Sequence, residues 1–323
     1  MENFSLLLAR DAQEAMQAGT HDRAAYIAGG TDLMQLMRAN VEAPSMLVDL
    51  ARLDLRAISA DQNGLRLGAL VTMADAAAHP AVRRDYTMIS EALLLSASPQ
   101  VRNMGTMGGN LLQRTRCLYF RDTGFACNKR DPGSGCPAIQ GDNRNLAIFG
   151  GSRHCIATHP SDMPVALIAF DADVDLLAPG GSARSMKLAE LYRLPGDTPH
   201  LDTNLRPGEL ITAIRVPSHR LKSAYLKVRD RTSFAFAVVS VAAALEVEGG
   251  TIRDARVAFG GVAPMPWRPP AVEEALRGKP AREATFLEAA SHAADGAQPA
   301  SENGFKTTLV QRIALRALLQ AAG

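Results

Sequence analysis

Cysteine is scarce in this chain of 323 residues, and all of it lies in one 39-residue stretch. So few cysteines in so long a chain are unlike the pattern of a small secreted domain held together by disulfides. Two disulfides or four unrelated thiols are open alternatives, but the clustering favours a single ligand set for a metal centre. The four residues are Cys117, Cys127, Cys136 and Cys155.

The sequence also has little that would suggest a membrane or nucleic-acid partner. No apolar run reaches the roughly 20 residues that cross a bilayer, and Phe234 to Leu245, the longest weakly polar run, predicts a buried strand or helix. The 35 basic and 33 acidic residues leave a net charge of +2, which gives no overall reason to expect nucleic acid. Residues 1–10 lack the basic region and the cleavage site of a signal peptide.

Several catalytic and nucleotide-binding motifs are absent. The chain has no G-x-G-x-x-G fingerprint and no Walker A lysine, so neither a Rossmann site nor a P-loop is indicated. It has no Ser-His-Asp arrangement, no H-E-x-x-H and no G-x-S-x-G, so nothing points to an autonomous hydrolase.

The first 110 residues alternate between strand-like and helix-like segments, which is typical of an α/β region. Thr31-Asp32 and Thr72 are natural caps for the helices that follow them. The expected strands are 24–28, 46–50 and 65–68, and the expected helices are 33–38, 73–78 and 82–95.

The remainder of the chain predicts a second domain, as its length allows. Pro207, Gly208 and Pro217 mark the boundary, followed by apolar segments and a Gly249-Gly250 hairpin turn. This pattern favours an antiparallel sheet covered by helices. The expected elements from residue 163 onward are helices at 163–170, 271–277 and 307–321, strands at 172–177, 223–228, 236–247 and 251–260, and a strand leading into a helix at 183–192.

The cysteine segment, residues 114–157, has little regular periodicity and is rich in Gly, Arg, Asn and Asp. A loop this long inside a compact domain needs a reason, and a bound metal centre would supply one. Thiolates suit iron–sulfur clusters and zinc. Intervals of 9, 8 and 18 residues between the cysteines fit neither a zinc ribbon nor a ferredoxin motif. The cations that would stabilise an anionic cluster are Arg114, Arg116, Arg121, Lys129 and Arg130. The histidines that could replace a thiolate as a ligand are His154 and His159.

Two glycine-rich turns are candidates for holding a phosphate. Ile27 to Asp32 is a strand end, a glycine pair and a helix start, and Asn103 to Asn110 carries the spacing G-x-x-G-G. Glycine lets the backbone approach a ligand closely, and N–H groups at a helix start favour phosphate. Each turn alone could be an ordinary connection, but together they could grip the two ends of a pyrophosphate.

Two charged residues also have alternative interpretations. Asp162, like Ser161, could cap the helix from residue 163, or its carboxylate could bond a cofactor hydroxyl or ring N–H. Lys227 begins the charged run 227–231, which could be a solvated strand end or could place the lysine against a cofactor that becomes anionic on reduction.

Taken together, these segments resemble the FAD-binding medium subunit of the molybdenum hydroxylases, the xanthine dehydrogenase and aldehyde oxidoreductase family. Ala28 to Asp32 is similar to the first FAD pyrophosphate loop of the family, and Gly105 to Asn110 to the second. Pro160-Ser161-Asp162 is similar to the motif that follows the second loop, although here all four cysteines stand between the two.

That insertion resembles the one in the FAD subunit of three-subunit periplasmic aldehyde oxidoreductases, where it binds a [4Fe–4S] cluster. The similar runs include 110–117, 127–130, 132–136, 155–163 and 227–231. A related insertion occurs in the FAD subunit of 4-hydroxybenzoyl-CoA reductase, which is the main alternative within the family, beside a xanthine dehydrogenase-like complex.

The resemblance implies an α+β fold. Residues 1–218 would form a two-lobed FAD domain of the vanillyl-alcohol-oxidase type with the cluster insertion at 114–157, and residues 219–323 a small C-terminal domain. The implied ligands of the cluster are Cys117, Cys127, Cys136 and Cys155. The implied FAD contacts are Tyr26, Ile27, Ala28, Gly29, Gly30, Thr31, Asp32, Leu33, Thr106, Gly108, Gly109, Asn110, Asp162 and Lys227.

The implied function is electron transfer. A molybdenum-cofactor large subunit would oxidise aldehydes to acids, and a [2Fe–2S] small subunit would pass the electrons to this FAD and on to an external acceptor. The chain would reach the periplasm with a signal-bearing partner, or stay in the cytoplasm. Two other readings are a self-contained flavin oxidase, for which the C-terminal part is small, and a colourless zinc-stabilised binding module.

Overall fold

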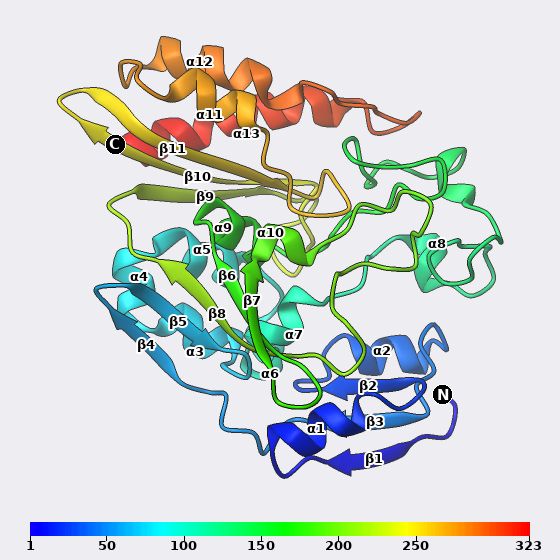
Figure 1. Ribbon diagram of the computed structural model, residues 1–323. Helices are drawn as coiled ribbons and strands as arrows, with labels where there is room; N and C mark the ends of the chain where they lie inside the picture. Colours follow the sequence, from blue (N-terminus) through cyan, green and yellow to red (C-terminus); the bar gives the residue numbers. More distant parts are fainter.

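Three β-sheets organise the chain into two lobes and a C-terminal layer (Figure 1). The computed structural model describes residues 1–323. The first lobe is a parallel sheet of order β1-β3-β2, which pairs β1 (Ser5–Leu8) and β2 (Ala24–Ile27) with β3 (Met46–Asp49). Helices α1 (Ala12–Ala18) and α2 (Leu33–Arg38) accompany it. The strands at 24–27 and 46–49 and helix α2 match the sequence expectation, whereas β1 and α1 were not expected.

The second lobe is built on a five-stranded antiparallel sheet of order β4-β5-β8-β6-β7. Helices α3, α5 and α9 pack together beside it, and their apolar faces join the sheet in the largest buried cluster. The strands are β4 (Ile58–Asp61), β5 (Gly64–Gly68), β6 (Asp173–Leu177), β7 (Ala183–Lys187) and β8 (Leu210–Pro217). The helices are α3 (Met73–Ala78), α4 (Pro80–Asp85), α5 (Thr87–Leu95), α6 (Pro99–Met104), α7 (Met107–Leu111), α9 (Met163–Ala169) and α10 (Leu188–Leu191).

One helix expected from the sequence is divided in two. The periodicity of 82–95 predicts one continuous helix, but α4 ends at Asp85 and α5 begins at Thr87. Tyr86 between them leaves the helical region, with φ −128° and ψ 46°. Its ring is buried edge-on against Phe170 and lies close to His219. This tertiary contact accompanies the break, and periodicity alone carries no sign of it.

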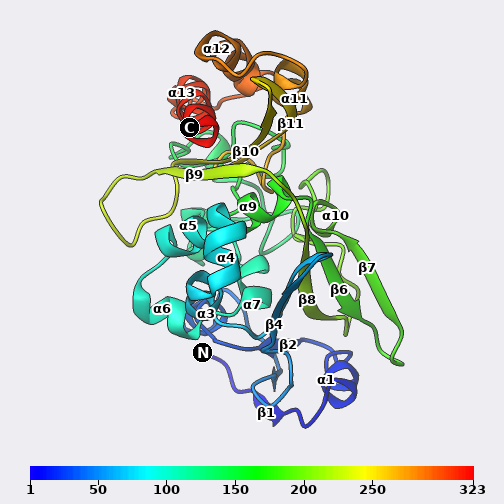
Figure 2. The same cartoon turned by 90° about the vertical axis from the view of Figure 1, so that its left-hand side faces the viewer.

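The C-terminal part is an antiparallel sheet of order β11-β10-β9 with helices on its outer face (Figures 1 and 2). Helices α5 and α9 of the second lobe pack against its inner face, so the first seven residues of β10 are all buried. This confirms the expected α+β class, with two lobes and a helix-covered antiparallel sheet behind them. The elements are β9 (Lys222–Val228), β10 (Val239–Glu248), β11 (Thr251–Gly260), α11 (Pro270–Leu276), α12 (Glu283–Ser291) and α13 (Phe305–Ala322).

The expectation for residues 234–245 needs correction. The sequence predicts a buried element from Phe234 or Phe236 onward, but β10 begins only at Val239. Both phenylalanines lie in the loop between β9 and β10, where about half of each side chain is exposed. The loop projects beyond the sheet in Figure 2. Hydrophobicity alone therefore did not separate a core strand from an exposed aromatic loop.

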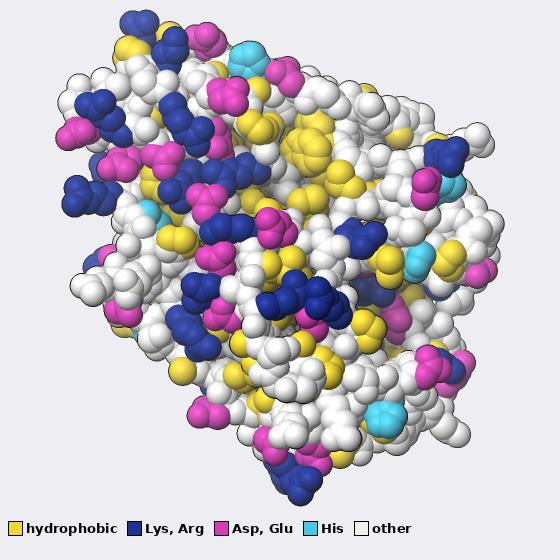
Figure 3. All heavy atoms as spheres, viewed as in Figure 1, with side chains coloured by type: hydrophobic (Ala, Val, Ile, Leu, Met, Phe, Trp, Pro, Cys, Tyr) yellow, Lys and Arg dark blue, Asp and Glu magenta, His cyan; other side chains and the backbone are white.

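The cysteine segment is as irregular as its composition suggests. Between α7 and α9 the chain forms only α8 (Leu118–Arg121) and a 3₁₀ turn, Pro137–Ile139, at the side of the molecule (Figure 1). No helix in the structure is long and apolar enough to cross a membrane. On the face shown in Figure 3, acidic and basic side chains are intermingled.

Candidate functional site

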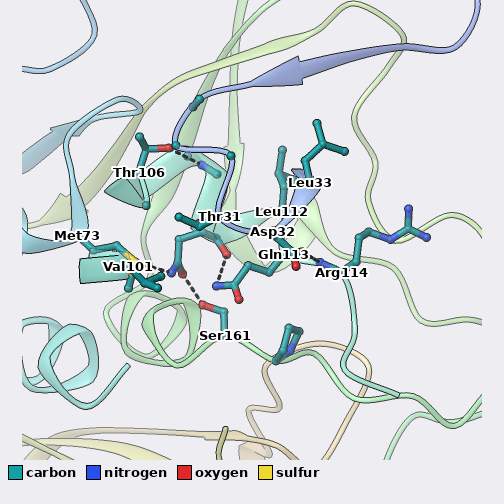
Figure 4. A pocket seen from close by; sticks show the side chains of 18 of the residues that line it. Thr31, Asp32, Leu33, Met73, Val101, Thr106, Leu112, Gln113, Arg114 and Ser161 are labelled. Carbon is teal, nitrogen blue, oxygen red and sulfur yellow. Dashed lines mark hydrogen bonds between the residues drawn. The ribbon is translucent and has the colours of Figure 1, made fainter. Parts of the chain in front are cut away.

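A cavity of about 690 Å³ is lined by the first sheet, the second lobe and the start of the cysteine segment. Its walls include α2, α7 and the loop before α9, as Figure 4 shows from close by. This volume is typical of a site for an organic ligand. Every residue assigned to FAD from the sequence lines this one cavity, namely Tyr26, Ile27, Ala28, Gly29, Gly30, Thr31, Asp32, Leu33, Thr106, Gly108, Gly109, Asn110, Asp162 and Lys227.

The first glycine turn presents free backbone donors to the cavity. The N–H groups of residues 29–32 donate to no acceptor in the protein, although each of these residues lines the cavity. Gly30 has φ +67°, which suits glycine. A Cβ on Gly29 would lie 1.9 Å from the carbonyl oxygen of Met104, so only glycine allows this approach of the two turns. Consecutive free N–H groups form a concavity that suits phosphate oxygens.

The second glycine turn has a different role from the first. It forms the start of α7, and its N–H groups are already bonded within the protein. The N–H groups of Met107 and Gly108 donate to Val71 and Ala69, and the Thr106 hydroxyl accepts from Gly109 at 3.2 Å. The second turn therefore contributes shape and side chains, and the first turn contributes the free donors. The two turns are in contact, as the pyrophosphate hypothesis requires, but they are not equivalent.

Asp32 does not cap α2 as the sequence suggested. Its carboxylate accepts from the Arg114 N–H at 2.9 Å, from Arg116 at 2.6 Å and from Arg121 at 2.9 Å. Burial opposes ionisation here, but the two guanidinium groups hold the pKa of Asp32 below its usual value. One carboxylate between two arginines leaves a net positive charge beside the free N–H groups, which favours an anionic ligand.

Asp162 and Lys227 form a buried ion pair at another part of the cavity wall. The lysine Nζ lies 2.7 Å from Asp162 Oδ2, and the two side chains are 1% and 4% exposed. Asp162 also accepts from the Tyr225 hydroxyl at 2.7 Å, and Lys227 donates to the Leu95 carbonyl at 3.1 Å. Asp162 stands at the N-cap of α9 without capping it. The interpretation of Lys227 as a solvated strand end is therefore wrong.

Ser161, the other proposed cap of α9, also faces away from the helix. Its hydroxyl donates to the side-chain oxygen of Asn110, which belongs to the second glycine turn (Figure 4). The loop before α9 is thus tied to α7 by side chains, and this places Asp162 on the cavity wall. Sequence spacing alone could not reveal a bond between residues 51 positions apart.

Two lining segments were not predicted to contact a ligand. Residues 205 and 209–211 line the cavity, and so do the loop residues 231 and 234–236. Phe236 stacks on the guanidinium group of Arg116, 4.7 Å from ring centroid to Cζ. The sequence did contain a signal for the second segment. It places two phenylalanines next to a charged run, in a chain with only 5% aromatic residues.

The four cysteines are all free thiols and line a second, smaller cavity. They pack in one apolar cluster with Tyr119, Phe120 and Leu36. The structure therefore brings the predicted ligand set together and contains no disulfide. His154 also lines this cavity, whereas His159 is buried elsewhere against Tyr192.

Burial makes the thiols unreactive, because it disfavours the thiolate form. Burial raises the pKa of Cys117 to about 12, that of Cys155 to about 11, and that of Cys136 in the same direction. The neighbouring backbone amides of Phe120 and Ala157 act against this rise in pKa at Cys117 and Cys155. A metal that bound the sulfurs would displace the thiol protons.

The space between the cysteines limits what they can hold. The cavity volume is about 10 Å³, which is room for about one water molecule and excludes an organic ligand. Any group held there must be bonded directly to sulfur, since metal–sulfur bonds of about 2.3 Å are much shorter than van der Waals contacts. No three His, Cys, Asp or Glu side chains are close enough together for one metal ion.

Comparison with known families decides what kind of chain this is. The family described as the FAD binding domain in molybdopterin dehydrogenase matches residues 2–219, and the CO dehydrogenase flavoprotein C-terminal domain matches residues 223–321. The chain is an FAD-binding medium subunit of the molybdenum hydroxylase family. It is therefore an FAD-dependent oxidoreductase subunit.

Individual relatives cover nearly the whole chain. It is 48% identical over 312 residues to the aldehyde oxidoreductase FAD-binding subunit PaoB of Escherichia coli (strain K12), a match that covers 96% of this chain and 95% of the relative. It is 28% identical to the glyceraldehyde dehydrogenase medium chain of Sulfolobus acidocaldarius, with 99% and 98% covered.

Solved structures show the same fold. A chain of quinoline 2-oxidoreductase from Pseudomonas putida 86 superposes with a TM-score of 0.76 at 26% identity, and the match covers 99% of this chain and 96% of the other. A chain of carbon monoxide dehydrogenase from Hydrogenophaga pseudoflava gives a TM-score of 0.77 at 26% identity, with 99% and 97% covered.

Proposed function

We propose that this chain is the FAD- and [4Fe–4S]-carrying subunit of a molybdenum-dependent aldehyde oxidoreductase. The observation that carries the proposal is the pair of adjacent sites, one cavity with four free N–H groups and one with four free thiols. The 48% identity to an aldehyde oxidoreductase FAD-binding subunit supports the substrate class.

In this proposal the first glycine turn holds the FAD pyrophosphate. Residues 29–32 donate their free N–H groups to phosphate oxygens, and Arg116 and Arg121 offset its negative charge. Lys227 makes two of the three hydrogen bonds that its ammonium group can donate, which leaves one for the flavin or its ribityl chain. Asp162 fixes the position of Lys227 through their 2.7 Å ion pair. FAD, when bound, accepts and releases electrons singly or in pairs, as transfer between one-electron clusters and an external acceptor requires.

The cysteine cavity would hold the [4Fe–4S] cluster through Cys117, Cys127, Cys136 and Cys155. Its four free thiols, which lie in or against one apolar cluster, and the resemblance of the 114–157 segment to a cluster-binding insertion support this assignment. Lys129 adds a buried positive charge near Cys155, which would balance part of the charge of the cluster.

The wider complex belongs to the same proposal. A large subunit with a molybdenum cofactor would oxidise the aldehyde, and a small [2Fe–2S] subunit would deliver its two electrons to this chain. An external acceptor would then take them from the flavin. The compartment we propose is the periplasm, reached by export with a signal-bearing partner, and cell fractionation that finds the complex only in the cytoplasm would contradict it.

The substrate class can be tested on the complex that co-purifies with a tagged full-length chain. We expect this complex to contain molybdenum, and an added aldehyde to bleach its flavin absorbance under argon. Bleaching by a purine but not by aldehydes would favour a xanthine dehydrogenase-like complex. The 4-hydroxybenzoyl-CoA reductase alternative is favoured if the complex, once reduced by a strong reductant, is reoxidised by a 4-hydroxybenzoyl thioester and aldehydes do not reduce it.

The cluster can be tested separately with Cys136→Ser, which replaces the most accessible of the four thiols. We expect the variant to lose iron and the 114–157 segment to be cleaved more readily by protease, because a hydroxyl is a poor ligand for iron. Thr123→Ala, at an exposed position of the same segment, is the control. Full iron content and unchanged protease resistance in Cys136→Ser would refute the ligand assignment.

A further inference from the structure

Asp32 lies at the junction of the two proposed cofactor sites. It follows directly after the glycine pair of the first turn, and its own N–H is one of the four free donors. Its side chain, 15% exposed, is directed away from these donors and into the cysteine segment. The residue therefore presents its backbone to the FAD cavity and its carboxylate to three arginines at the start of the cysteine segment, which also line the FAD cavity.

The carboxylate of Asp32 organises the chain around Cys117. The three groups that donate to it are the N–H of Arg114 and the guanidinium groups of Arg116 and Arg121. Arg116 immediately precedes Cys117, and the N–H of Arg121 donates to the Cys117 carbonyl at 3.0 Å.

Arg121 closes this arrangement within the cysteine segment. Its guanidinium group also donates to the carbonyls of Thr115 and Arg114, at 2.8 and 2.9 Å. The position of the first cysteine and the position of Asp32 are therefore fixed by the same set of bonds.

A second contact joins the two sites through α2. Leu36, four residues after Asp32, is 2% exposed and packs in the apolar cluster that contains the cysteines. The same residue lines the FAD cavity. One short helix thus lines the FAD cavity and packs against the cluster that contains the cysteines, and Asp32 stands directly before it. Movement of the cysteine segment would be transmitted to the glycine turn by packing as well as by charge.

We propose that Asp32 is a positioning residue that couples occupancy of the cysteine site to FAD binding. The inference rests on the proposed function, since it needs both groups. With a cluster bound, Cys117 would be held in place, and Arg116 and Arg121 with it. The two arginines would then hold Asp32 and the free N–H groups in the geometry that binds phosphate. An empty cysteine site leaves these arginines less restrained, so the glycine turn is less well ordered for FAD. By thermodynamic linkage, FAD must favour cluster retention by the same factor.

The test compares FAD affinity with and without iron, using the full-length chain purified anaerobically. FAD dissociation constants would be measured by flavin fluorescence for the wild-type chain as isolated and after removal of iron by a chelator. We expect iron removal to weaken FAD binding by about 5- to 150-fold, the usual range for coupled sites. Asp32→Asn should bind FAD more weakly even with iron present, and iron removal should then change its affinity little.

Asp171→Asn is the matched control. Asp171 also holds two arginines, Arg256 at 3.0 Å and Arg268, but it lines neither cavity. In this variant, iron removal should weaken FAD binding by the same factor as in the wild type. Arg121→Gln serves as a second variant if Asp32→Asn does not fold, because it removes one of the two charged groups that donate to Asp32. Iron removal should then weaken FAD binding less than it does in the wild type.

The outcomes distinguish this inference from the proposed function. Equal FAD affinity with and without iron in the wild type would overturn the coupling and leave both cofactor assignments standing. Unchanged iron dependence in Asp32→Asn or Arg121→Gln would also overturn the role of Asp32. A wild-type chain that binds FAD but never contains iron would overturn the cluster assignment, and the coupling with it.

Discussion

The two proposed cofactor sites differ in how the chain builds them. The FAD cavity is formed by the ends of strands and helices, so its residues are held by backbone hydrogen bonds and a continuous core. The cysteine segment has almost no regular structure and is held by side chains such as Asn143, Lys129 and Arg121. The comparison suggests that the first site is preformed, whereas the second depends on a few buried polar bonds and on the group it binds.

The largest effect should come from breaking the ion pair of the FAD cavity with Lys227→Met. This change leaves the Asp162 carboxylate buried without its cation, which typically costs about 3 to 5 kcal/mol. Urea unfolding of the FAD-free chain would measure it. Lys187→Met is the control, since its pair with Asp173 is half exposed and should change stability by less than about 1 kcal/mol. Equal losses in the two variants would show that the buried pair has no special role.

An intermediate effect is expected in the cysteine segment for Asn143→Ala. The amide of Asn143 is fully buried, donates to Gly141 and Ser301 at 3.0 Å, and accepts from the Glu302 N–H. Its removal leaves these groups unpaired, at a cost of about 1 to 3 kcal/mol. Limited proteolysis should detect opening of the segment before global unfolding.

Asn145→Ala, two residues away and exposed, provides the matched comparison. It should leave the protease resistance unchanged. If Asn143→Ala lowers the global unfolding midpoint and leaves the segment as resistant as before, the segment does not depend on this side chain, and the contrast between the two sites fails.

A pH-dependent effect is expected at Lys306, which bonds the cysteine segment at Leu146. Its buried amine donates to the carbonyls of Leu146 and Gly261, and burial lowers its pKa to about 7. Between pH 7 and about 10.5 the unfolded chain therefore binds more protons than the folded chain, and this residue makes stability rise with pH.

The comparison with Lys306→Met isolates this contribution. The wild type should gain stability relative to the variant from pH 7 to pH 9, by at most about 1.4 kcal/mol per pH unit. Urea midpoints at several pH values would measure the difference. If the difference in unfolding free energy between the wild type and Lys306→Met is constant from pH 6 to pH 9, Lys306 does not change its charge on unfolding in this range.

Elements of the fold that depend on local sequence were predictable, and features that depend on distant contacts were not. Alternating apolar segments gave β2, α2, β3, β10 and β11 at nearly the right residues, because these elements follow the periodicity of their own sequence. The break at Tyr86 and the exposed loop at Phe234 were missed, because both depend on partners far away in the chain.

The residues of the candidate sites could be predicted from the sequence, but the hydrogen bonds that join them could not. The glycine turns and the four cysteines could be selected from residue type and spacing, and the structure brings each set together. The bond from Asp162 to Tyr225 and the three bonds to Asp32 join residues 63 to 89 positions apart. Local sequence favoured helix caps at both aspartates, and tertiary contacts overrode that preference.

The most direct test of the account is the content of FAD, iron and acid-labile sulfide in the anaerobically purified full-length chain. The account predicts about one FAD, four iron and four sulfide per chain. FAD without iron would contradict the cysteine-site assignment, and a folded chain with neither would contradict the proposed function.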